Sequence, residues 1–463
     1  MFDKEIYVQR RAALKSKISN GIGLFMGNRE APCNYKDNTY PFRQDSTFLY
    51  FFGLDEPDLA AVIDFETGQE TLFADDVSLD AIVWTGPLPK VAEKAELIGV
   101  AHTATRGQLA AFLQEAQQKD RTIHFLPPYR GENMIELMDI LKIHPEQQKE
   151  KASEEFIRAV VALRMIKQPE EIAELDKACN LGYAMHYTAM TMAKPGMVEQ
   201  ELVGIMAGIA VSGGYKPSFP IILTQNGEVM HGHAHHQILE KGRLLLMDAG
   251  AELQSHYCSD FTRTIPVGGT FIGPAKDLYN VVLQANNHCI GMCAPGVSFK
   301  DVHLAAATII TDGLKEIGLM KGNTEEAVAT GAHAAFFPTG LGHNMGLDVH
   351  DMEDLGEQYV GYDHTVTRST QFGLKSLRMA RKLEVGNVVT VEPGFYVIPA
   401  LLDLWEKEGH NTAFINFDKC KPLYGFGGIR IEDDVLITKD GYRLLGSKRL
   451  PVTPEEIQEV MSL

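Results

Sequence analysis

Five side chains that can bind metal ions are dispersed over the second half of the chain. They lie in the strings LLLMDAGAE, YCSDFTRT, GLGHNMGLDVHD, VVTVEPGFY and FGGIRIEDDV, which supply Asp248, Asp260, His343, Glu392 and Glu432. Four carboxylates and one imidazole can hold two divalent cations with a shared water, and such a pair generates a nucleophile for hydrolysis at neutral pH. We therefore expect a fold that brings these five residues to one dinuclear metal site.

Local patterns place most of these ligands at the ends of strands. Asp248 closes the apolar run RLLLM, and Glu392 follows the β-branched run NVVTV. In SDFTRTIPV, alternation puts Asp260, Thr262 and Thr264 on one face of a strand. Taken singly, each carboxylate would be an ordinary turn or exposed strand residue. Asp248 and Asp260 lie at opposite ends of a predicted hairpin, so both carboxylates could project to the same side.

Arg430 and Glu432 are two residues apart in GGIRIEDDV and so share a strand face. An arginine beside a metal ligand can keep the carboxylate ionised and orient it, so we count Arg430 among the catalytic residues. A surface salt bridge is the alternative. His343 lies in a glycine-rich loop, and His350, seven residues later, could reach the same cavity. A single loop histidine is more often structural, but two histidines between acidic strands favour a ligand.

The donor set also indicates which metal it suits. Because oxygen ligands predominate over one imidazole, Mn²⁺ fits best, with Co²⁺, Fe²⁺ and Zn²⁺ as alternatives.

Size and charge limit the class of protein. A chain of 463 residues is expected to form two or three domains. Its formal net charge of −18 and the lack of a basic stripe argue against nucleic acid as a partner. We see no signal-peptide core and no apolar run of membrane-spanning length. The six cysteines have no disulfide-framework spacing, so we expect reduced thiols in a cytoplasmic protein.

The chain divides into a domain of residues 1–160 and a catalytic domain of residues 161–463. In the first domain, apolar runs predict strands, and LAAFLQEAQQ predicts a helix. The runs are GIGLFMG (21–27), TFLYFFGL (47–54), AAVIDF (60–65), TLFA (71–74) and IHFL (123–126). Gln168-Pro169 fits a helix start and marks the beginning of the second domain.

The second domain contains a faint internal repeat. A long helical pattern ends in MAKPGMVEQEL and another ends in MCAPGVSFKDV, and their glycines, Gly196 and Gly296, lie 100 residues apart. Each is followed by a β-rich region with an acidic turn, MDAG or VEPG. Duplicated α-then-β halves would place the metal site at a pseudo-two-fold centre. Two unrelated helix–turn–helix segments are the alternative.

The five ligand strings, in this order, resemble the pita-bread metallopeptidases, which share the creatinase and methionine aminopeptidase fold, and in particular the aminopeptidase P and prolidase branch. The string NTYPFRQDSTFLYFFGLDEP resembles the N-terminal domain of aminopeptidase P. The resemblance implies an α/β two-domain protein: a creatinase-like α/β domain followed by a pita-bread α+β catalytic domain with pseudo-two-fold symmetry. The spacing of 12 between Asp248 and Asp260 exceeds the usual family spacing by one residue, which a turn or bulge can absorb.

The resemblance also assigns roles to the ligands. It implies that Asp248 binds one metal, that His343 and Glu392 serve mainly the other, and that Asp260 and Glu432 bridge both.

Four further residues match positions that contact substrate in the family. His231 and His350 match histidines that hold the reacting carbonyl and the tetrahedral intermediate. Arg378 matches an arginine that grips the carboxylate of a dipeptide, although a surface arginine is the plain alternative. Trp84 resembles a tryptophan that reaches a neighbouring subunit's active site, so a dimer or tetramer is implied. We expect the rest of HGHAHHQ, His233, His235 and His236, to lie in a solvated loop or to bind metal only incidentally.

The implied activity is hydrolysis of the bond between an N-terminal residue and a following proline in small peptides. Glu392 would act as the general base, and His231 and His350 would stabilise the oxyanion. The N-terminal signature favours an Xaa-Pro aminopeptidase. The long insertion between Glu392 and Glu432 favours an Xaa-Pro dipeptidase (prolidase). A non-catalytic peptide-binding protein on the same fold is a remote alternative, because such proteins lose ligands that are all present here.

Overall fold

The chain forms two compact units in the computed structural model, which describes residues 2–463. The N-terminal unit comprises Met1–Arg164 with Met352–Tyr359, and the C-terminal unit comprises Met165–Asp351 with Val360–Leu463. Both units contain helices and strands, which confirms the expected two-domain α/β architecture. None of the helices formed by residues 2–463 has the apolar length that a membrane span requires.

A five-stranded mixed sheet lies at the centre of the N-terminal unit, in the order β6–β5–β4–β1–β7. Neighbours β1, β4 and β5 are antiparallel, and the outer strands run parallel to theirs. The strands are β1 (Ile22–Met26), β4 (Ala60–Asp64), β5 (Glu70–Phe73), β6 (His102–Ala104) and β7 (Ile123–His124). Four of them confirm predicted strands. Their apolar side chains pack with α5 (Leu109–Gln118), a confirmed helix, and α6 (Gly131–Leu141).

The remaining elements of this unit are helices, short 3-10 turns and a two-stranded hairpin. They are α1 (Lys4–Lys15), β2 (Pro32–Tyr35), β3 (Asn38–Thr39), α3 (Leu79–Thr85), α4 (Val91–Leu97), η1 (Arg106–Gln108), α7 (Pro145–Lys151), α8 (Glu154–Arg164) and η3 (Glu353–Leu355), with α14 (Glu357–Val360) at the end of the second segment.

One predicted strand was wrong. The run TFLYFFGL (47–54) forms a helix, α2 (Ser46–Phe52), with all seven residues buried. A short, wholly apolar run has no periodicity that separates a strand from a buried helix. The end residues decide: the Asp45 side chain accepts a hydrogen bond from the Phe48 amide at 2.8 Å, and Gly53 ends the helix at φ 64°.

The first half of the C-terminal unit is a helix pair followed by a small antiparallel sheet. The helices are α9 (Pro169–Met192), which begins at the predicted proline, and α10 (Glu199–Gly213). The sheet has the order β12–β10–β9, with β9 (Ile222–Thr224), β10 (Leu244–Ala249) and β12 (Phe261–Pro266). Beside it, β8 (Lys216–Pro217) pairs with β11 (Ala251–Glu252).

The second half repeats this plan. The helices α11 (Ala275–Met292) and α12 (Phe299–Ile317) precede a sheet ordered β13–β16–β17, with β13 (Val388–Val391), β16 (Asp433–Thr438) and β17 (Gly441–Leu444). A further pair joins β14 (Gly394–Tyr396) to β15 (Gly428–Arg430). The other elements are α13 (Thr324–Ala329), η2 (Ala332–Ala335), η4 (Leu374–Ser376), α15 (Pro399–Glu408), α16 (Phe417–Cys420), η5 (Lys421–Leu423) and α17 (Pro454–Met461).

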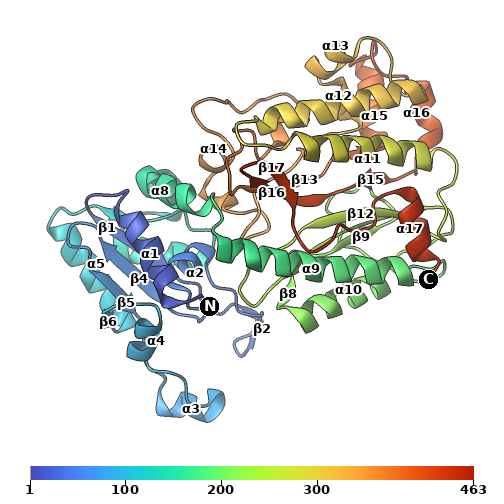
Figure 1. Ribbon diagram of the computed structural model, residues 1–463. Helices are drawn as coiled ribbons and strands as arrows, with labels where there is room; N and C mark the ends of the chain where they lie inside the picture. Colours follow the sequence, from blue (N-terminus) through green and yellow to red (C-terminus); the bar gives the residue numbers. More distant parts are fainter. Residues whose placement is uncertain (1) are drawn as a thin grey trace. The chain divides into compact units, whose positions relative to one another are not determined.

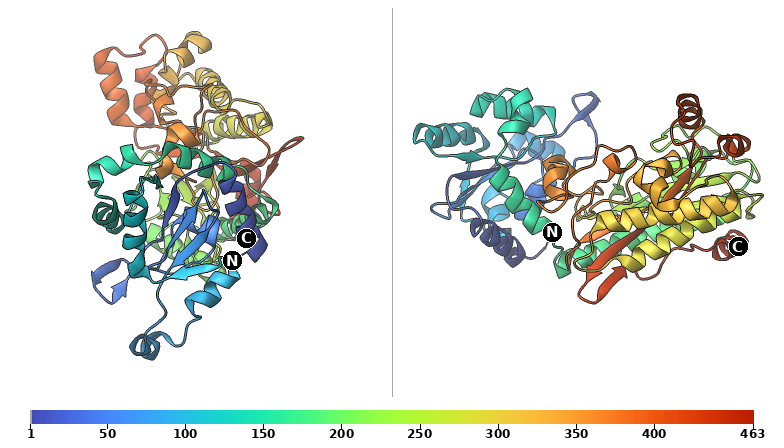
Figure 2. Two further views of the ribbon diagram at one scale, coloured as in Figure 1. Left: turned by 90° about the vertical axis from the view of Figure 1, so that its left-hand side faces the viewer. Right: turned by 90° about the horizontal axis from the view of Figure 1, so that it is seen from above.

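The predicted duplication is confirmed by this element order. The partners within each helix pair, α9 with α10 and α11 with α12, run side by side, and each pair contacts strands of its own half (Figures 1 and 2). The turns after α9 and α11 contain Gly196 at φ 92° and Gly296 at φ 85°, a left-handed backbone that favours glycine.

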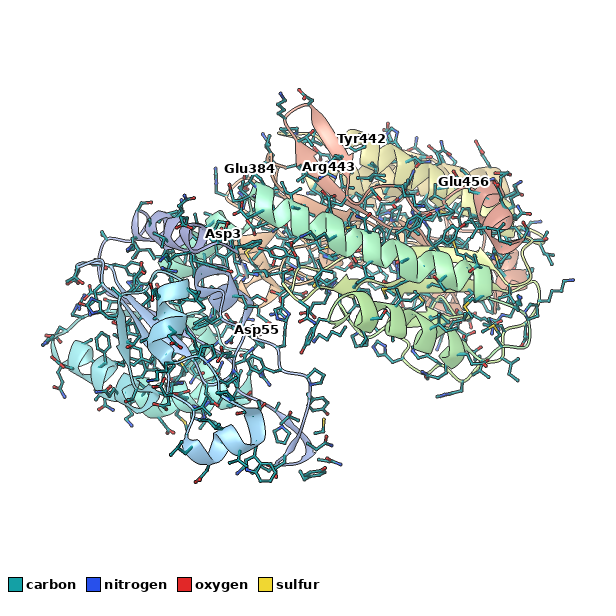
Figure 3. The ribbon with its side chains drawn as sticks, turned by 60° about the horizontal axis from the view of Figure 1, so that its bottom comes forward. Asp3, Asp55, Glu384, Tyr442, Arg443 and Glu456 are labelled. Atoms are coloured by element: carbon teal, nitrogen blue, oxygen red, sulfur yellow. The ribbon has the colours of Figure 1, made fainter. Side chains whose placement is uncertain are left out.

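The two halves also carry their acidic residues at matching places. Ala249, the last residue of β10, faces Phe261, and Val391, the last residue of β13, faces Asp433. Asp260 and Glu432 each directly precede the second partner of these pairs. The halves meet where the Glu432 amide donates to the Thr262 carbonyl at 3.0 Å. Arg443, labelled in Figure 3, adds an ion pair with Asp176 of α9 at 2.8 Å.

Candidate metal centre

Three of the predicted ligands form a compact buried group. One donor atom each from Asp260, His343 and Glu432 lies within 4.8 Å of the others. His343 Nε2 is 3.4 Å from Asp260 Oδ2 and 3.8 Å from Glu392 Oε1. The structure therefore brings four of the five predicted ligands together through direct approaches.

The fifth, Asp248, joins the group through Arg430. The Arg430 guanidinium is buried and directs its three nitrogens to three partners. Nη2 donates to the Asp248 carboxylate, Nη1 to the Tyr396 hydroxyl at 2.9 Å, and Nε to Thr262 Oγ1 at 3.0 Å. The Thr262 hydroxyl donates in turn to Glu432 Oε2 at 2.6 Å. Arg430 thus orients one carboxylate directly and a second through Thr262.

Strand register explains why these residues converge. Asp248 lies opposite Thr262 across the β10–β12 pair, so both belong to one short stretch of the sheet. The ladder between β10 and β12 continues without a shift of register. The residues between them turn at Leu253–His256, where His256 has φ 67°. The long spacing from Asp248 to Asp260 is therefore accommodated outside the paired strands.

The loop of His343 is held against the strand that precedes Glu392. A Cβ at Gly342 would lie 2.0 Å from the Thr390 carbonyl oxygen, so only glycine fits. The His343 amide donates to Thr390 Oγ1 at 3.1 Å. Its ring Nδ1 donates to the Asn344 carbonyl at 3.0 Å, because a carbonyl can only accept. This contact fixes the tautomer and leaves Nε2 as the nitrogen that can bind a cation.

Burial and like charge dominate the electrostatics. Burial, followed by repulsion from Asp248, Asp434 and Glu392, raises the pKa of Asp260 well above its ordinary value. Burial and the neighbouring carboxylates likewise raise the pKa of Glu432. Burial acts to lower the pKa of Arg430, but the surrounding acidic groups outweigh it and raise that pKa.

The donor set fits divalent cations. Asp248 Oδ1 and Asp260 Oδ1 are buried and have no hydrogen-bond partner within residues 2–463. Four carboxylates here face one arginine and one imidazole, so further positive charge would balance them. Oxygen donors with a single imidazole suit hard or borderline divalent ions. We conclude that these residues can hold such ions.

His350 lies beside the group, as expected from its loop. Its ring centroid is 4.0 Å from that of His343, and the side chain is half-buried. The next residue, Asp351, forms a buried ion pair with Lys167 at 2.8 Å. This pair ties the histidine loop to the segment that begins the C-terminal unit.

His231 is exposed in the turn after β9, directly after Met230, which packs against the cluster of Ile222, Leu246 and Tyr396. No hydrogen bond or ion pair connects it to the five ligands within the described chain. For His235 the expectation of a solvated position was wrong. The residue is 7% exposed, and its Nδ1 contacts the Leu223 carbonyl oxygen at 3.0 Å, because the loop folds back on β9. His233 and His236 are exposed, as expected.

Two other predicted residues lie in segments that carry none of the five ligands. Arg378 is half-buried in the segment after η4, where its carbonyl oxygen packs closely on Gly361. Trp84 is 87% exposed on α3 of the N-terminal unit.

Sequence reasoning missed several supporting residues. Tyr396 anchors Arg430, and Thr390 holds the His343 amide. Asp434 Oδ2 accepts from the Asp260 amide at 3.0 Å and from the Cys179 thiol at 3.3 Å. Thr262 was placed on the face of Asp260 by alternation, which was the available signal. Tyr396, Thr390 and Asp434 each lie two or four residues from a predicted ligand, and no local pattern distinguishes these positions from their neighbours.

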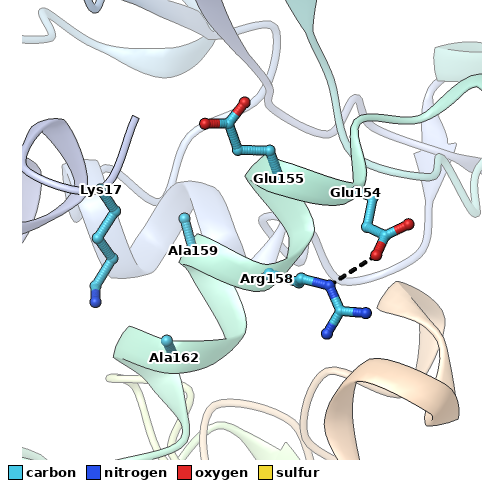
Figure 4. Close-up of a pocket in the computed structure, with 6 residues that line it drawn as sticks. All are labelled: Lys17, Glu154, Glu155, Arg158, Ala159 and Ala162. Atoms are coloured by element: carbon cyan, nitrogen blue, oxygen red, sulfur yellow. Dashed lines mark hydrogen bonds and ion pairs between the residues drawn. The ribbon is translucent and has the colours of Figure 1, made fainter. Parts of the chain in front are cut away.

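A separate surface pocket of about 610 Å³ lies along α8 (Figure 4). It is lined by Lys17, Glu154, Glu155, Arg158, Ala159 and Ala162. Arg158 Nε forms an ion pair with Glu154 Oε1 at 2.8 Å. None of these six lining residues belongs to the predicted site.

Comparisons with known proteins agree with this geometry. The family model "Metallopeptidase family M24" matches residues 173–439, and "Aminopeptidase P, N-terminal domain" matches residues 7–124. A probable Xaa-Pro aminopeptidase of Fusarium vanettenii is 29% identical over 97% of this chain and 94% of its own. The Xaa-Pro dipeptidase of Homo sapiens is 31% identical over 96% and 89%.

Solved structures show the same similarity over the whole chain. The aminopeptidase PepP of Pseudomonas aeruginosa has a TM-score of 0.81 at 25% identity, covering 100% of this chain and 98% of that one. A variant of Escherichia coli aminopeptidase P in complex with substrate has a TM-score of 0.80 at 28% identity, with the same coverage.

Proposed function

The chain belongs to metallopeptidase family M24 and is a metallo-exopeptidase, and from this premise we propose that it hydrolyses the bond between an N-terminal residue and a following proline. The observation that carries the proposal is the convergence of Asp260, His343 and Glu432 within 4.8 Å, with Glu392 beside them and Asp248 joined through Arg430. A relative named as a probable Xaa-Pro aminopeptidase and one named as an Xaa-Pro dipeptidase each match nearly the whole chain.

The cofactor we propose is a pair of divalent cations, with Mn²⁺ as the native metal. Asp248 would bind one ion, His343 and Glu392 the other, and Asp260 and Glu432 would bridge both. When bound, two such ions lower the pKa of a shared water and polarise the scissile carbonyl. The matching positions of Asp260 and Glu432 in the two halves support their shared bridging role.

The remaining chemistry is assigned to side chains of this chain. Glu392 is 20% exposed, so water can reach its carboxylate, which would accept a proton from the attacking water and pass it to the proline nitrogen. His350 and His231 would donate hydrogen bonds to the carbonyl oxygen as negative charge develops there. Arg430 would hold the Asp248 carboxylate in its orientation through a charge-assisted hydrogen bond.

Proline at the second position would be selected by shape. Its nitrogen carries no hydrogen and its ring fixes φ, so a pocket for the ring excludes other residues. Arg378 would bind a substrate carboxylate through its planar fork of donors. Trp84, a large apolar side chain exposed on α3, would contact substrate from a neighbouring subunit, in a dimer or tetramer.

An Xaa-Pro dipeptidase is the second candidate. The human dipeptidase is 31% identical over 96% of this chain. The long segment between Glu392 and Glu432, whose length favours a dipeptidase, contains the helices α15 and α16. Arg378 would be the residue that favours a dipeptide, because only a dipeptide places its carboxylate directly after the proline ring.

The deciding experiment compares kcat/KM for Xaa-Pro dipeptides and Xaa-Pro-Yaa tripeptides with added Mn²⁺. We expect hydrolysis of the tripeptides, and a loss of more than about 100-fold in kcat/KM for Asp260→Ala. Asp418→Ala, which removes an exposed carboxylate from the same unit, is the matched control. A marked preference for dipeptides would establish the second candidate. Full activity of Asp260→Ala would refute the metal centre.

We further propose a domain of residues 1–160, a catalytic domain of residues 161–463 and a cytoplasmic location. The family matches at residues 7–124 and 173–439 are compatible with these bounds, and the first segment of the N-terminal unit ends at Arg164, although Met352–Tyr359 also belongs to that unit. Size-exclusion chromatography with light scattering would measure the oligomeric state.

A further inference from the structure

Asn286 of α11 joins the two strand ends that carry Glu392 and Glu432. Its side chain is fully buried. The amide nitrogen Nδ2 donates to the Val391 carbonyl at 2.9 Å and to the Ile431 carbonyl at 3.1 Å. Each of these carbonyls belongs to the residue directly before a predicted ligand.

The hydrogen bonds of Asn286 fall where the backbone ladder is interrupted. The β13–β16 pair ends at Val391 and Asp433, and the β14–β15 pair resumes at Gly394 and Arg430. The segment between them includes Pro393, which has no amide hydrogen to donate. In this gap the backbone contributes a long hydrogen bond from the Ile431 amide to the Pro393 carbonyl at 3.4 Å, and the Asn286 side chain adds a second connection between the two segments.

The orientation of the Asn286 amide follows from its other contact. Arg449 Nη2 donates to Asn286 Oδ1 at 2.6 Å, and a guanidinium can only donate. The oxygen must therefore face Arg449, and Nδ2 must face the two carbonyls. Arg449 is itself held by Asp433 at 2.8 Å, and Arg263, paired with Asp433, donates to the Glu432 carbonyl at 2.7 Å. Asn286 thus belongs to a hydrogen-bonded network behind the ligands, buried except at Arg449.

The first half of the unit has a counterpart at the equivalent position. His186 of α9 lies 100 residues before Asn286, the same interval that separates Gly196 from Gly296. It is fully buried, and its Nε2 donates to the Ala249 carbonyl at 3.0 Å. Ala249 ends β10 as Val391 ends β13, and it directly follows Asp248.

We propose that Asn286 and His186 are a symmetry-related pair of positioning residues that hold the ligand-bearing strand ends at the separation metal binding requires. This inference rests on the metal centre proposed above. Neither side chain touches the reacting atoms. Each fixes a backbone carbonyl beside a ligand, so its loss should weaken metal binding more than a comparable buried hydrogen bond elsewhere does.

The test measures Mn²⁺ affinity by titration calorimetry on the metal-free full-length chain, together with its Tm. We expect Asn286→Leu to raise the Kd for Mn²⁺ by about tenfold or more. The matched control is Tyr279→Phe, which removes one buried hydrogen bond from the same helix, 2.8 Å to the Val452 carbonyl. It should lower the metal-free Tm but change the Kd less than about twofold.

A second pair of variants covers the case in which Asn286→Leu does not fold. His186→Leu should weaken Mn²⁺ binding, and His186→Gln should restore it, because the glutamine amide nitrogen reaches as far as Nε2 and can still donate to the Ala249 carbonyl. Wild-type Kd in Asn286→Leu, or in His186→Leu, would overturn the inference while leaving the metal centre intact. A wild-type chain that neither binds Mn²⁺ nor cleaves Xaa-Pro peptides would refute the proposed function, and this inference with it.

Discussion

Arg430 illustrates how one side chain can organise a site that is dispersed in the sequence. Its three nitrogens contact Asp248, Tyr396 and Thr262, which come from three different strands. A planar fork with donors in fixed directions can serve three partners at once, whereas an ammonium group is a single point of charge. The position therefore requires arginine for its shape as well as its charge.

The residue-level prediction is that Arg430→Lys lowers Mn²⁺ affinity and kcat/KM by about 10- to 100-fold. A lysine can keep the charge near Asp248 but cannot also hold Thr262, so Glu432 loses its orientation. Calorimetric Mn²⁺ titration and steady-state kinetics measure the effect. Arg443→Lys is the control, because that arginine pairs with Asp176 away from the ligands. Equal Kd values for wild type and Arg430→Lys would contradict the role.

At the scale of elements, α12 and η2 meet through two unusual histidines. His303 and His333 are buried with ring centroids 6.4 Å apart, and His303 also packs on Phe337 at 5.3 Å. None of the four ring nitrogens has a hydrogen-bond partner within the described residues. Burial lowers the pKa of His303 to about 3 and that of His333 to about 4. Both rings are therefore neutral in the folded chain near pH 7.

This contact predicts a loss of stability in weak acid. In the unfolded chain these histidines protonate near pH 6.5, whereas in the folded chain they stay neutral to a lower pH. Their burial therefore does not reduce the free energy of unfolding above pH 6.5, and that free energy falls as the pH drops toward 4. At pH 5 each histidine should lower the free energy of unfolding by about 2 kcal/mol relative to its value near pH 7. Urea unfolding at pH 7.5 and pH 5.0 measures this, and the double substitution His303→Phe with His333→Phe should reduce the difference.

The control for this prediction is His364→Gln, which changes an exposed histidine of the same unit. It should leave the pH dependence as it is in the wild type. If the double variant lost as much stability between the two pH values as the wild type does, the buried pair would have no part in it.

At the scale of the whole molecule, the ligands belong to one compact unit. Asp248, Asp260, His343, Glu392 and Glu432 all lie within Met165–Asp351 and Val360–Leu463. The site forms where two α-then-β halves meet, each contributing one residue of the equivalent pair Asp260 and Glu432. Metal binding should therefore stabilise this unit selectively.

Hydrogen–deuterium exchange with and without Mn²⁺ checks this expectation. At a free Mn²⁺ concentration of about 100 times Kd, binding adds about 2.7 kcal/mol to the stability of the state that binds it. We expect slower exchange in β10, β12, β13 and β16 and unchanged exchange in β1, β4 and β5. The Asp260→Ala variant should show no such protection. Equal protection in both units would contradict the prediction.

Much of this protein could be predicted from local chemistry. Strand ends with acidic residues, the Pro169 helix start and the repeat marked by Gly196 and Gly296 all depend on near neighbours in the chain, and the structure has them where the patterns indicated. The buried run at 47–54 was misassigned because its periodicity is uninformative and its ends decide its form.

Contacts between residues far apart in the chain became visible only once the chain was folded. The sequence determined that five metal-binding side chains exist and lie beside strands. It could not determine that Arg430 would reach Tyr396, or that Asn286 of α11 would cross-link the carbonyls before Glu392 and Glu432. These contacts join residues more than 30 positions apart. Their partners are backbone carbonyls and hydroxyls, which carry no sequence signature and become specific only when packing brings them within hydrogen-bond distance.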